Sequence, residues 1–188
     1  MDDWYIDALY SGTQKCLSCP PGLAPVSFSN RALEKLNNRK SKVPNWYLDL
    51  SMITQYWLGE ARVYHHTAPI NMLYGLYQAC YNILDEGLDI VIQRHRDMHD
   101  LLVAELKSIG LELFVNEHDR LPMLNSIIIP EDIKDGEIRS KLLNEYRIEI
   151  GGGLGPLTGK IWRIGLMGET AKKESIQKLM DALKKILN

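Results

Sequence analysis

Apolar residues recur at helical spacing along most of the chain. This periodicity predicts helices over residues 31–38, 49–57, 69–84, 88–109, 135–146 and 171–187. Ser29, Asp49 and Thr170 are placed to cap the first, second and last of these helices. Gly110 follows the fourth helix as a C-cap.

Short apolar runs between these helices predict strands over residues 5–10, 111–115, 124–129, 148–150 and 161–166, and one more apolar run covers 24–28. Gly87 interrupts the pattern and is the predicted domain boundary. After it the order is helix, strand, strand, helix, strand, strand, helix. That order is typical of an α+β unit with a mostly antiparallel sheet.

The helix predicted over residues 69–84 is apolar on two faces. Ile70 and Tyr77 belong to one apolar stripe, and Leu76 and Ile83 belong to another. A helix of this kind is buried from two sides. It is either a central core helix or a helix between domains or subunits. A buried strand that starts at residue 5 also indicates that more protein precedes it, because chain ends are usually peripheral.

The composition is that of an ordinary globular protein. The chain has 188 residues, 45% of them hydrophobic and 24% charged, which fits one domain or two small ones. A net charge of -2 gives no reason to expect nucleic acid or an anionic membrane as a partner. No apolar run approaches the roughly 20 residues of a membrane span. Three cysteines without a framework pattern, and an acidic N-terminus without a signal peptide, favour the cytoplasm.

Lys15 follows the first predicted strand after small and polar residues. Ligands of open α/β sheets lie beyond the carboxyl ends of strands. A lysine there, beside the hydroxyl of Thr13 and the amide of Gln14, suits a Schiff base with an aldehyde cofactor, and burial favours the neutral amine that attacks. Most lysines are solvated surface charges. The residue type alone leaves both interpretations open.

Three other patterns have ordinary structural explanations. Cys16 and Cys19 are spaced like a redox or metal pair, but no second pair accompanies them, and packed turn cysteines are expected. His65 and His66 are expected to point to opposite faces of an extended segment, with hydrogen-bonding roles and no shared metal ion. The glycine run at residues 151–155 lacks nucleotide-loop spacing and is expected to be a turn that needs positive φ.

Arg163 lies between apolar residues of the strand predicted over residues 161–166. An arginine in such a strand needs a partner anion. The anion is either the carboxylate of a buried salt bridge or a substrate carboxylate bound by both ends of the guanidinium. The spacing favours neither.

Three stretches, taken in order, resemble one known family. They are SGTQKCLSCPPGLAPVSFS (residues 11–29), VYHHTAP (63–69), and IEIGGGLG (148–155) running on to WRIGL (162–166). They resemble the class V, fold-type I pyridoxal-phosphate aminotransferases, and most of all the alanine–glyoxylate and serine–pyruvate branch. The resemblance covers essentially the whole chain. In the family, however, the cofactor lysine lies mid-chain, whereas here it is residue 15.

The resemblance implies an α/β protein that is the C-terminal portion of a fold-type I transferase. Residues 1–86 would be the tail of the large cofactor-binding domain, and residues 87–188 the small α+β domain with its mostly antiparallel sheet. In the family, the preceding half supplies the carboxylate at the pyridine nitrogen and the ring stacked on the cofactor. No residue here is assigned to either role, and Asp2 and Asp3 do not match that carboxylate.

The resemblance also implies how the cofactor, pyridoxal 5'-phosphate, would be held. Lys15 would bind it as a Schiff base and then carry the substrate α-proton as base and acid. Gln14 would contact the cofactor phosphate in its own subunit. Tyr64 and Thr67 would reach the phosphate of the partner subunit in a homodimer.

For the substrate, the resemblance implies that Arg163 binds the α-carboxylate and that the backbone at Gly152 approaches the amino acid. The implied reaction is amino transfer from alanine or serine to glyoxylate or pyruvate. The chain would be half of an enzyme, completed by a separate N-terminal chain or by residues removed in processing. The rival hypothesis is a non-catalytic truncated remnant that serves at most as an interaction module through the helix at 69–85.

Overall fold

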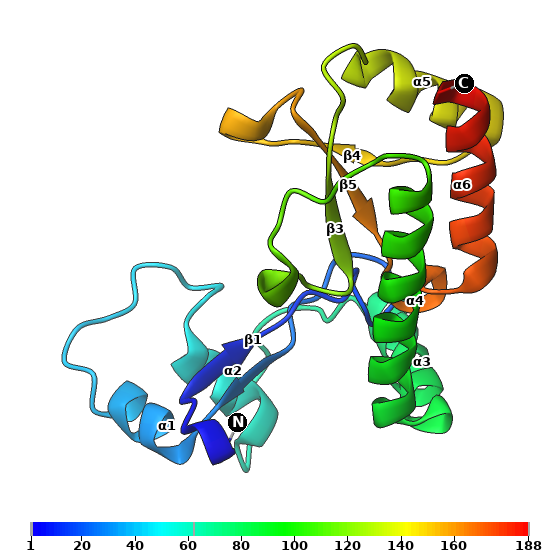
Figure 1. Ribbon diagram of the computed structural model, residues 1–188. Helices are drawn as coiled ribbons and strands as arrows, with labels where there is room; N and C mark the ends of the chain where they lie inside the picture. Colours follow the sequence, from blue (N-terminus) through cyan, green and yellow to red (C-terminus); the bar gives the residue numbers. More distant parts are fainter. Residues whose placement is uncertain (1, 62, 188) are drawn as a thin grey trace. The chain divides into compact units, whose positions relative to one another are not determined.

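A computed structural model describes residues 2–61 and 63–187 (Figure 1). The chain divides into two compact units, Met1–Gln14 with Cys19–Gln78, and Lys15–Ser18 with Ala79–Asn188. The domain boundary predicted between residues 86 and 87 falls within the second unit, and it stays a prediction for the complete protein. Across the described residues, no helix is both long and apolar enough to cross a membrane.

The first unit contains a small antiparallel sheet and two short helices. The sheet pairs β1 (Ala8–Tyr10) with β2 (Val26–Phe28), and the helices are α1 (Asn30–Asn37) and α2 (Leu50–Leu58). Both predicted caps are confirmed, because Ser29 accepts a hydrogen bond from Ala32 N–H and Asp49 accepts one from Ser51 N–H. The strand predicted over residues 5–10 is shorter, since Asp2–Trp4 forms a 3-10 helix and Tyr5 has a φ of 51°.

The first unit has almost no interior of its own. Among its described residues only Thr13, Cys19 and His65 are buried. Large apolar side chains lie exposed throughout it, including Trp4, Tyr5, Tyr10, Trp46, Tyr47, Trp57 and Leu58. Exposed apolar side chains are typical of surfaces that contact other protein when they form a contiguous patch.

Helix α3 (Ile70–Glu86) begins directly after Pro69, as predicted, and contributes residues to both units. The two-sided burial predicted for it is wrong for this chain. Only Ala79 is buried, whereas Tyr74 is 72% exposed and Leu84 is 76% exposed. The central core helix is therefore not seen in this chain, and the alternative of a helix between domains or subunits stays a prediction.

The second unit carries a three-stranded antiparallel sheet of order β3-β5-β4, so the predicted α+β unit is confirmed. Its elements are α4 (Leu88–Ser108), β3 (Leu124–Ile128), α5 (Asp135–Tyr146), β4 (Gly151–Gly152), β5 (Ile161–Gly165) and α6 (Lys173–Leu187). Helices α4 and α6 pack side by side (Figure 1).

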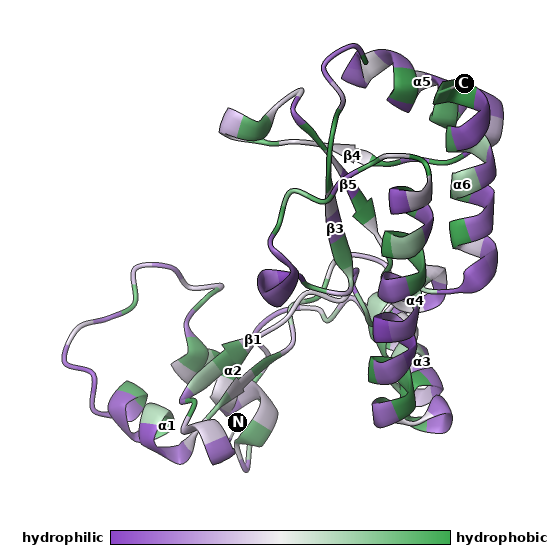
Figure 2. Ribbon diagram, viewed as in Figure 1, coloured by the Kyte–Doolittle hydropathy of each residue, from purple (hydrophilic) through white to green (hydrophobic). Residues whose placement is uncertain are grey.

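One hydrophobic core fills the second unit. Hydrophobic and hydrophilic segments alternate along α6 (Figure 2), as expected for a helix with one face in the core. The large core side chains with no exposed surface come from α4, α5, α6, β3 and β5 and are Leu102, Leu106, Ile127, Leu142, Trp162, Met180 and Leu183. Burial of these side chains is the main favourable term in the stability of this unit.

Three predictions about element bounds in the second unit are wrong. The strand expected at 111–115 is a single bridge from Leu113 to Ile127, because the chain bends away at residues 114–115. The strand expected at 148–150 is displaced to Gly151–Gly152. Thr170 does not cap α6, since its hydroxyl accepts a hydrogen bond from Met167 N–H within a short 3-10 helix, Gly168–Thr170.

Asp135 joins the start of α5 to the core strand β5. Its carboxylate accepts hydrogen bonds from Arg139 Nε at 2.7 Å, Arg139 Nη2 at 3.0 Å and Trp162 Nε1 at 3.1 Å. Trp162 is fully buried, so its indole N–H has to find a partner inside the protein. The Arg139 guanidinium, with a further contribution from the Trp162 N–H, lowers the pKa of Asp135 below its ordinary value.

We expect Asp135→Asn to lower the free energy of unfolding at pH 7 by about 1–3 kcal/mol, because the charged acceptor of the buried Trp162 N–H and of the Arg139 guanidinium is lost. Since the pKa of Asp135 is lowered by folding, its carboxylate stabilises the fold above about pH 4, and this is lost as the pH falls through the folded-state value. Urea unfolding at pH 7 and at acidic pH checks this. The difference between wild type and variant should shrink on acidification, whereas Glu137→Gln, in an exposed ion pair, should change little.

Candidate functional site

Lys15 lies in a tight turn between β1 and β2. Ser18 N–H donates to the Lys15 carbonyl at 2.9 Å, and Cys19 N–H donates to the Thr13 carbonyl at 3.1 Å. The hydroxyl of the fully buried Thr13 donates to the Pro20 carbonyl at 2.8 Å. These bonds fix the backbone while the Lys15 side chain stays exposed. The burial that would favour a neutral amine is therefore not supplied by this chain.

The cysteines beside Lys15 fit the packed-turn interpretation. Cys19 is buried and Cys16 is half-buried, and both are free thiols. Burial raises the pKa of the Cys16 thiol, which keeps it protonated and unreactive. Among the residues that the structure describes, no group of three or more His, Cys, Asp or Glu side chains could hold a metal ion.

Tyr64 and Thr67 form a pair of adjacent hydroxyls in the segment that leads to α3. The Tyr64 hydroxyl and Thr67 Oγ1 lie 2.6 Å apart, and both residues are exposed. Whichever hydroxyl accepts the shared hydrogen bond keeps its own hydrogen to donate outward. The pair is thus a hydrogen-bond donor group accessible to an anion.

The sequence predicts that His65 and His66 point to opposite faces. They do not, because the segment is not a regular strand. Their Nδ1 atoms lie 2.7 Å apart. His65 is buried, donates from Nε2 to the Trp46 carbonyl at 3.1 Å, and stacks on the Trp46 ring at 4.3 Å between centroids. These hydrogen bonds of His65 and His66 fix the backbone between Tyr64 and Thr67. Trp46 provides both contacts, and no motif in the sequence predicts this role.

Arg163 lies opposite Gly151 in the pairing of β5 with β4. Its Nε donates to the Gly152 carbonyl at 2.7 Å. No carboxylate of residues 2–61 or 63–187 forms an ion pair with it, so the buried salt bridge is not seen in the described chain. The guanidinium is half-buried. Its Nη atoms form no hydrogen bond with a described residue and can pair with a ligand carboxylate.

The glycine run after β4 forms a close turn. A Cβ on Gly153 would lie 1.9 Å from the Leu157 carbonyl oxygen, so only glycine fits there. Gly155 has a φ of 54°, which agrees with the expected positive φ in this run. A side chain on Gly152 would contact Arg139 and Asp135 at 3.4 Å. The run therefore brings bare backbone close to Arg163.

The predicted site residues are divided between the units. Lys15, Gly152 and Arg163 belong to the second unit, and Gln14, Tyr64 and Thr67 belong to the first. The structure brings Tyr64 to Thr67 and Arg163 to Gly152. Within the described residues, no hydrogen bond or ion pair joins Lys15 to the others.

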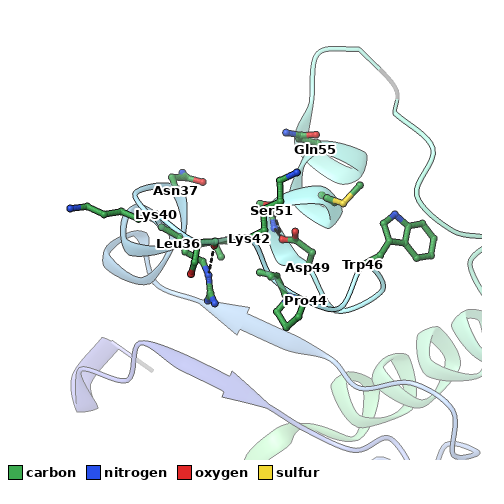
Figure 3. Close-up of a pocket in the computed structure, with 13 residues that line it drawn as sticks. Leu36, Asn37, Lys40, Lys42, Pro44, Trp46, Asp49, Ser51 and Gln55 are labelled. Carbon is green, nitrogen blue, oxygen red and sulfur yellow. Dashed lines mark hydrogen bonds between the residues drawn. The ribbon is translucent and has the colours of Figure 1, made fainter.

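A separate hollow of about 730 Å³ lies in the first unit (Figure 3). Side chains from α1, from α2 and from the loop between them line it, among them Lys40, Lys42 and Asp49. The two lysines are exposed. None of the predicted site residues is among the described residues that line this hollow.

The sequence profile of the family described as aminotransferase class-V matches residues 1–179. The chain belongs to the class V aminotransferases. It is 40% identical to the alanine–glyoxylate aminotransferase of Drosophila melanogaster, over 97% of this chain and 47% of that protein. It is 36% identical to the (S)-ureidoglycine–glyoxylate transaminase of Bacillus subtilis, over 100% of this chain and 49% of that protein.

Solved structures show the same fold. An alanine–glyoxylate aminotransferase from Nostoc sp. matches with a TM-score of 0.95 and 48% identity, over 100% of this chain and 49% of that one. A pyridoxamine–pyruvate aminotransferase from Mesorhizobium loti matches with a TM-score of 0.87 and 25% identity, over 100% and 48%. The predicted fold class is thus confirmed. The chain spans about half the length of the curated relatives it matches.

Membership of this family implies pyridoxal phosphate as the cofactor. The residues present fit it: Lys15 offers an accessible amine on a fixed backbone, and Tyr64 and Thr67 offer hydroxyl donors suited to a phosphate. Arg163 offers a guanidinium that no described carboxylate occupies. These groups are chemically suited to an aldehyde, a phosphate and a carboxylate.

We expect Gly153→Ala to lower the free energy of unfolding by about 1–3 kcal/mol, because the added methyl would overlap the Leu157 carbonyl and force the turn apart. Urea unfolding and the amide NMR shifts of residues 151–158 measure the effect. Gly136→Ala is the matched control, since a methyl there meets nothing within 4 Å. Equal stability of the two variants would contradict the close turn.

Proposed function

We propose that this chain is the C-terminal half of a pyridoxal-phosphate aminotransferase that moves an amino group from alanine or serine to glyoxylate or pyruvate. The observation that carries the proposal is an accessible Lys15 on a backbone-fixed turn, in a chain that the class V profile matches over residues 1–179. The substrate class follows the relatives, which are named for alanine, ureidoglycine and glyoxylate.

Lys15 would hold the cofactor through its Nζ amine, and the same amine would take and return the substrate α-proton. When bound, the cofactor supplies an electron sink for the charge left at the α-carbon. Gln14 contacts the cofactor phosphate beside Lys15. The fixed turn supports this assignment, since a lysine that changes roles has to return to the same place.

Tyr64 and Thr67 bind the phosphate of the cofactor held by the partner copy in a homodimer. Support comes from their exposure and from the 2.6 Å contact that presents both hydroxyls together. Hydroxyl groups that donate to a phosphate make charge-assisted hydrogen bonds, which are stronger than neutral ones.

Arg163 binds the α-carboxylate of the amino or keto acid through its Nη atoms. Its Nε is already bonded to the Gly152 carbonyl, which fixes the plane of the guanidinium before the substrate arrives. Pre-oriented donors cost less free energy when the ligand binds. Gly152 then lies next to the bound acid.

The complete enzyme needs the other half of the family architecture, which supplies the remaining contacts to the cofactor ring. The scarcity of buried residues in the first unit supports this requirement. The exposed apolar side chains of α3 favour a second candidate, a non-catalytic module that associates through this helix. Cofactor labelling separates the two candidates.

The purified chain mixed with pyridoxal phosphate should show a visible absorbance band and, after borohydride, carry the cofactor on Lys15. Peptide mass analysis should find at least about 10-fold more label on Lys15 than on the exposed Lys40. Of these two lysines, only Lys15 lies in the turn that we propose binds the cofactor. Lys15→Ala should abolish the band, whereas Lys40→Ala should keep it. Label spread evenly over surface lysines would favour the non-catalytic module.

Tyr64→Phe should weaken binding of pyridoxal phosphate about 10-fold and leave binding of phosphate-free pyridoxal unchanged, since only the phosphate bond is lost. Fluorescence titration with the two compounds measures the ratio. Tyr74→Phe, at another exposed tyrosine, is the control. An equal loss for both compounds would refute the phosphate role.

A further inference from the structure

The short 3-10 helix Gly168–Thr170 follows the strand of Arg163 and is held from α4. Arg94 Nη1 donates to the Gly168 carbonyl at 2.9 Å and to the Ala171 carbonyl at 3.0 Å. The Nε and Nη2 atoms of Arg94 donate to the Glu86 carboxylate at 2.6 and 2.9 Å. The Arg94 guanidinium lowers the pKa of Glu86, so the pair stays ionised at neutral pH.

His95, the next residue of α4, binds the other side of the same turn. It is 4% exposed. Its Nδ1 lies 2.7 Å from the Val91 carbonyl and therefore donates, and its Nε2 accepts from Gly168 N–H at 2.9 Å. Both contacts require the neutral ring with its hydrogen on Nδ1. His95 and Arg94 thus satisfy the N–H and the carbonyl of one glycine.

The lysine turn rests directly on Gly168. A Cβ there would lie 1.7 Å from Ser18 Oγ and 2.9 Å from the Cys16 carbonyl, and the φ of Gly168 is 56°. Ser18 Oγ accepts a hydrogen bond from Glu169 N–H at 2.9 Å. Ser18 N–H in turn donates to the Lys15 carbonyl. A continuous series of contacts thus leads from His95 through Gly168 and Ser18 to the backbone of Lys15.

We propose that His95 and Ser18 are positioning residues for Lys15. They hold the turn of Lys15–Ser18 against the 3-10 helix Gly168–Thr170, which follows the strand of Arg163. All the residues of this series belong to the second unit, which is why Lys15–Ser18 is part of it. The inference rests on the proposed function for the meaning of Lys15, but the contacts themselves can be tested without any cofactor.

These contacts explain how Lys15 and Arg163 can keep a fixed position relative to each other. Gly168 follows Arg163 closely along the chain, and it cannot move without breaking its bonds to Arg94 and His95. A hydrogen bond from a buried N–H to a buried ring nitrogen is costly to lose, because the N–H has no water to replace it. His95 therefore acts on Lys15 through Gly168 and Ser18 and touches no reacting atom.

The test is amide hydrogen exchange followed by NMR on the full chain without cofactor. His95→Leu should speed exchange at Ser18, Gly168 and Glu169 by at least about 10-fold, as loss of a buried hydrogen bond predicts. His95→Gln, whose amide oxygen can accept from Gly168, should restore part of the protection. His99→Leu is the matched control, since His99 lies on the same helix and binds the buried Asn125 instead.

Unchanged exchange at these amides in His95→Leu, or the same increase in His99→Leu, would overturn the proposal. If His95→Leu does not fold, Ser18→Ala at an exposed position replaces it and should speed exchange at Glu169 alone by about 10-fold. Unchanged Glu169 exchange in Ser18→Ala would overturn it equally.

Borohydride-trapped cofactor on Lys15 is the second measurement. Selective labelling that falls in His95→Leu and returns in His95→Gln supports both the positioning role and the proposed function. A wild-type chain that protects these amides through His95, but does not label Lys15 selectively, supports the positioning contacts and counts against the proposed function. Selective labelling that His95→Leu leaves intact counts against the positioning role alone.

Discussion

The second unit depends on satisfying backbone polar groups that its fold removes from water. Gly168 shows the constraint most clearly, because its N–H and its carbonyl are both bonded to α4 side chains rather than to solvent. His95 and Arg94 therefore occupy positions on a helix whose buried apolar residues are Val91, Leu102 and Leu106. Asp135 likewise accepts a hydrogen bond from the buried indole N–H of Trp162. The polar contacts at the edges of the core determine where the adjoining turns lie.

Much of this arrangement could be predicted from local sequence. Helix α5 has the predicted bounds because its apolar period and its acidic first turn agree. Ser29 and Asp49 were identified as caps because short polar side chains before an apolar period have few other roles. Thr170 is an exception to that rule, because its hydroxyl accepts a hydrogen bond within a 3-10 helix and does not cap α6.

The rest could not be predicted because it depends on residues that are distant in sequence, on side-chain orientation outside regular strands and helices, or on what covers a helix. His95 lies on the apolar stripe of its helix, which signals burial, but periodicity cannot identify a partner 73 residues later. The contact between His65 and His66 depends on side-chain orientation in an irregular segment, where alternation does not apply. The exposure of α3 was missed because a stripe shows that a helix needs cover and does not show which protein covers it.

The uneven distribution of buried residues has a consequence for how the protein is made. The first unit is synthesised before the second, yet it holds hardly any buried side chains with which to fold alone. The second unit encloses a complete core and can fold soon after it leaves the ribosome. In the interval, the tryptophans and tyrosines of the first unit are open to chaperones and to aggregation. We expect these exposed side chains to lower the yield of folded protein when the chain is made alone.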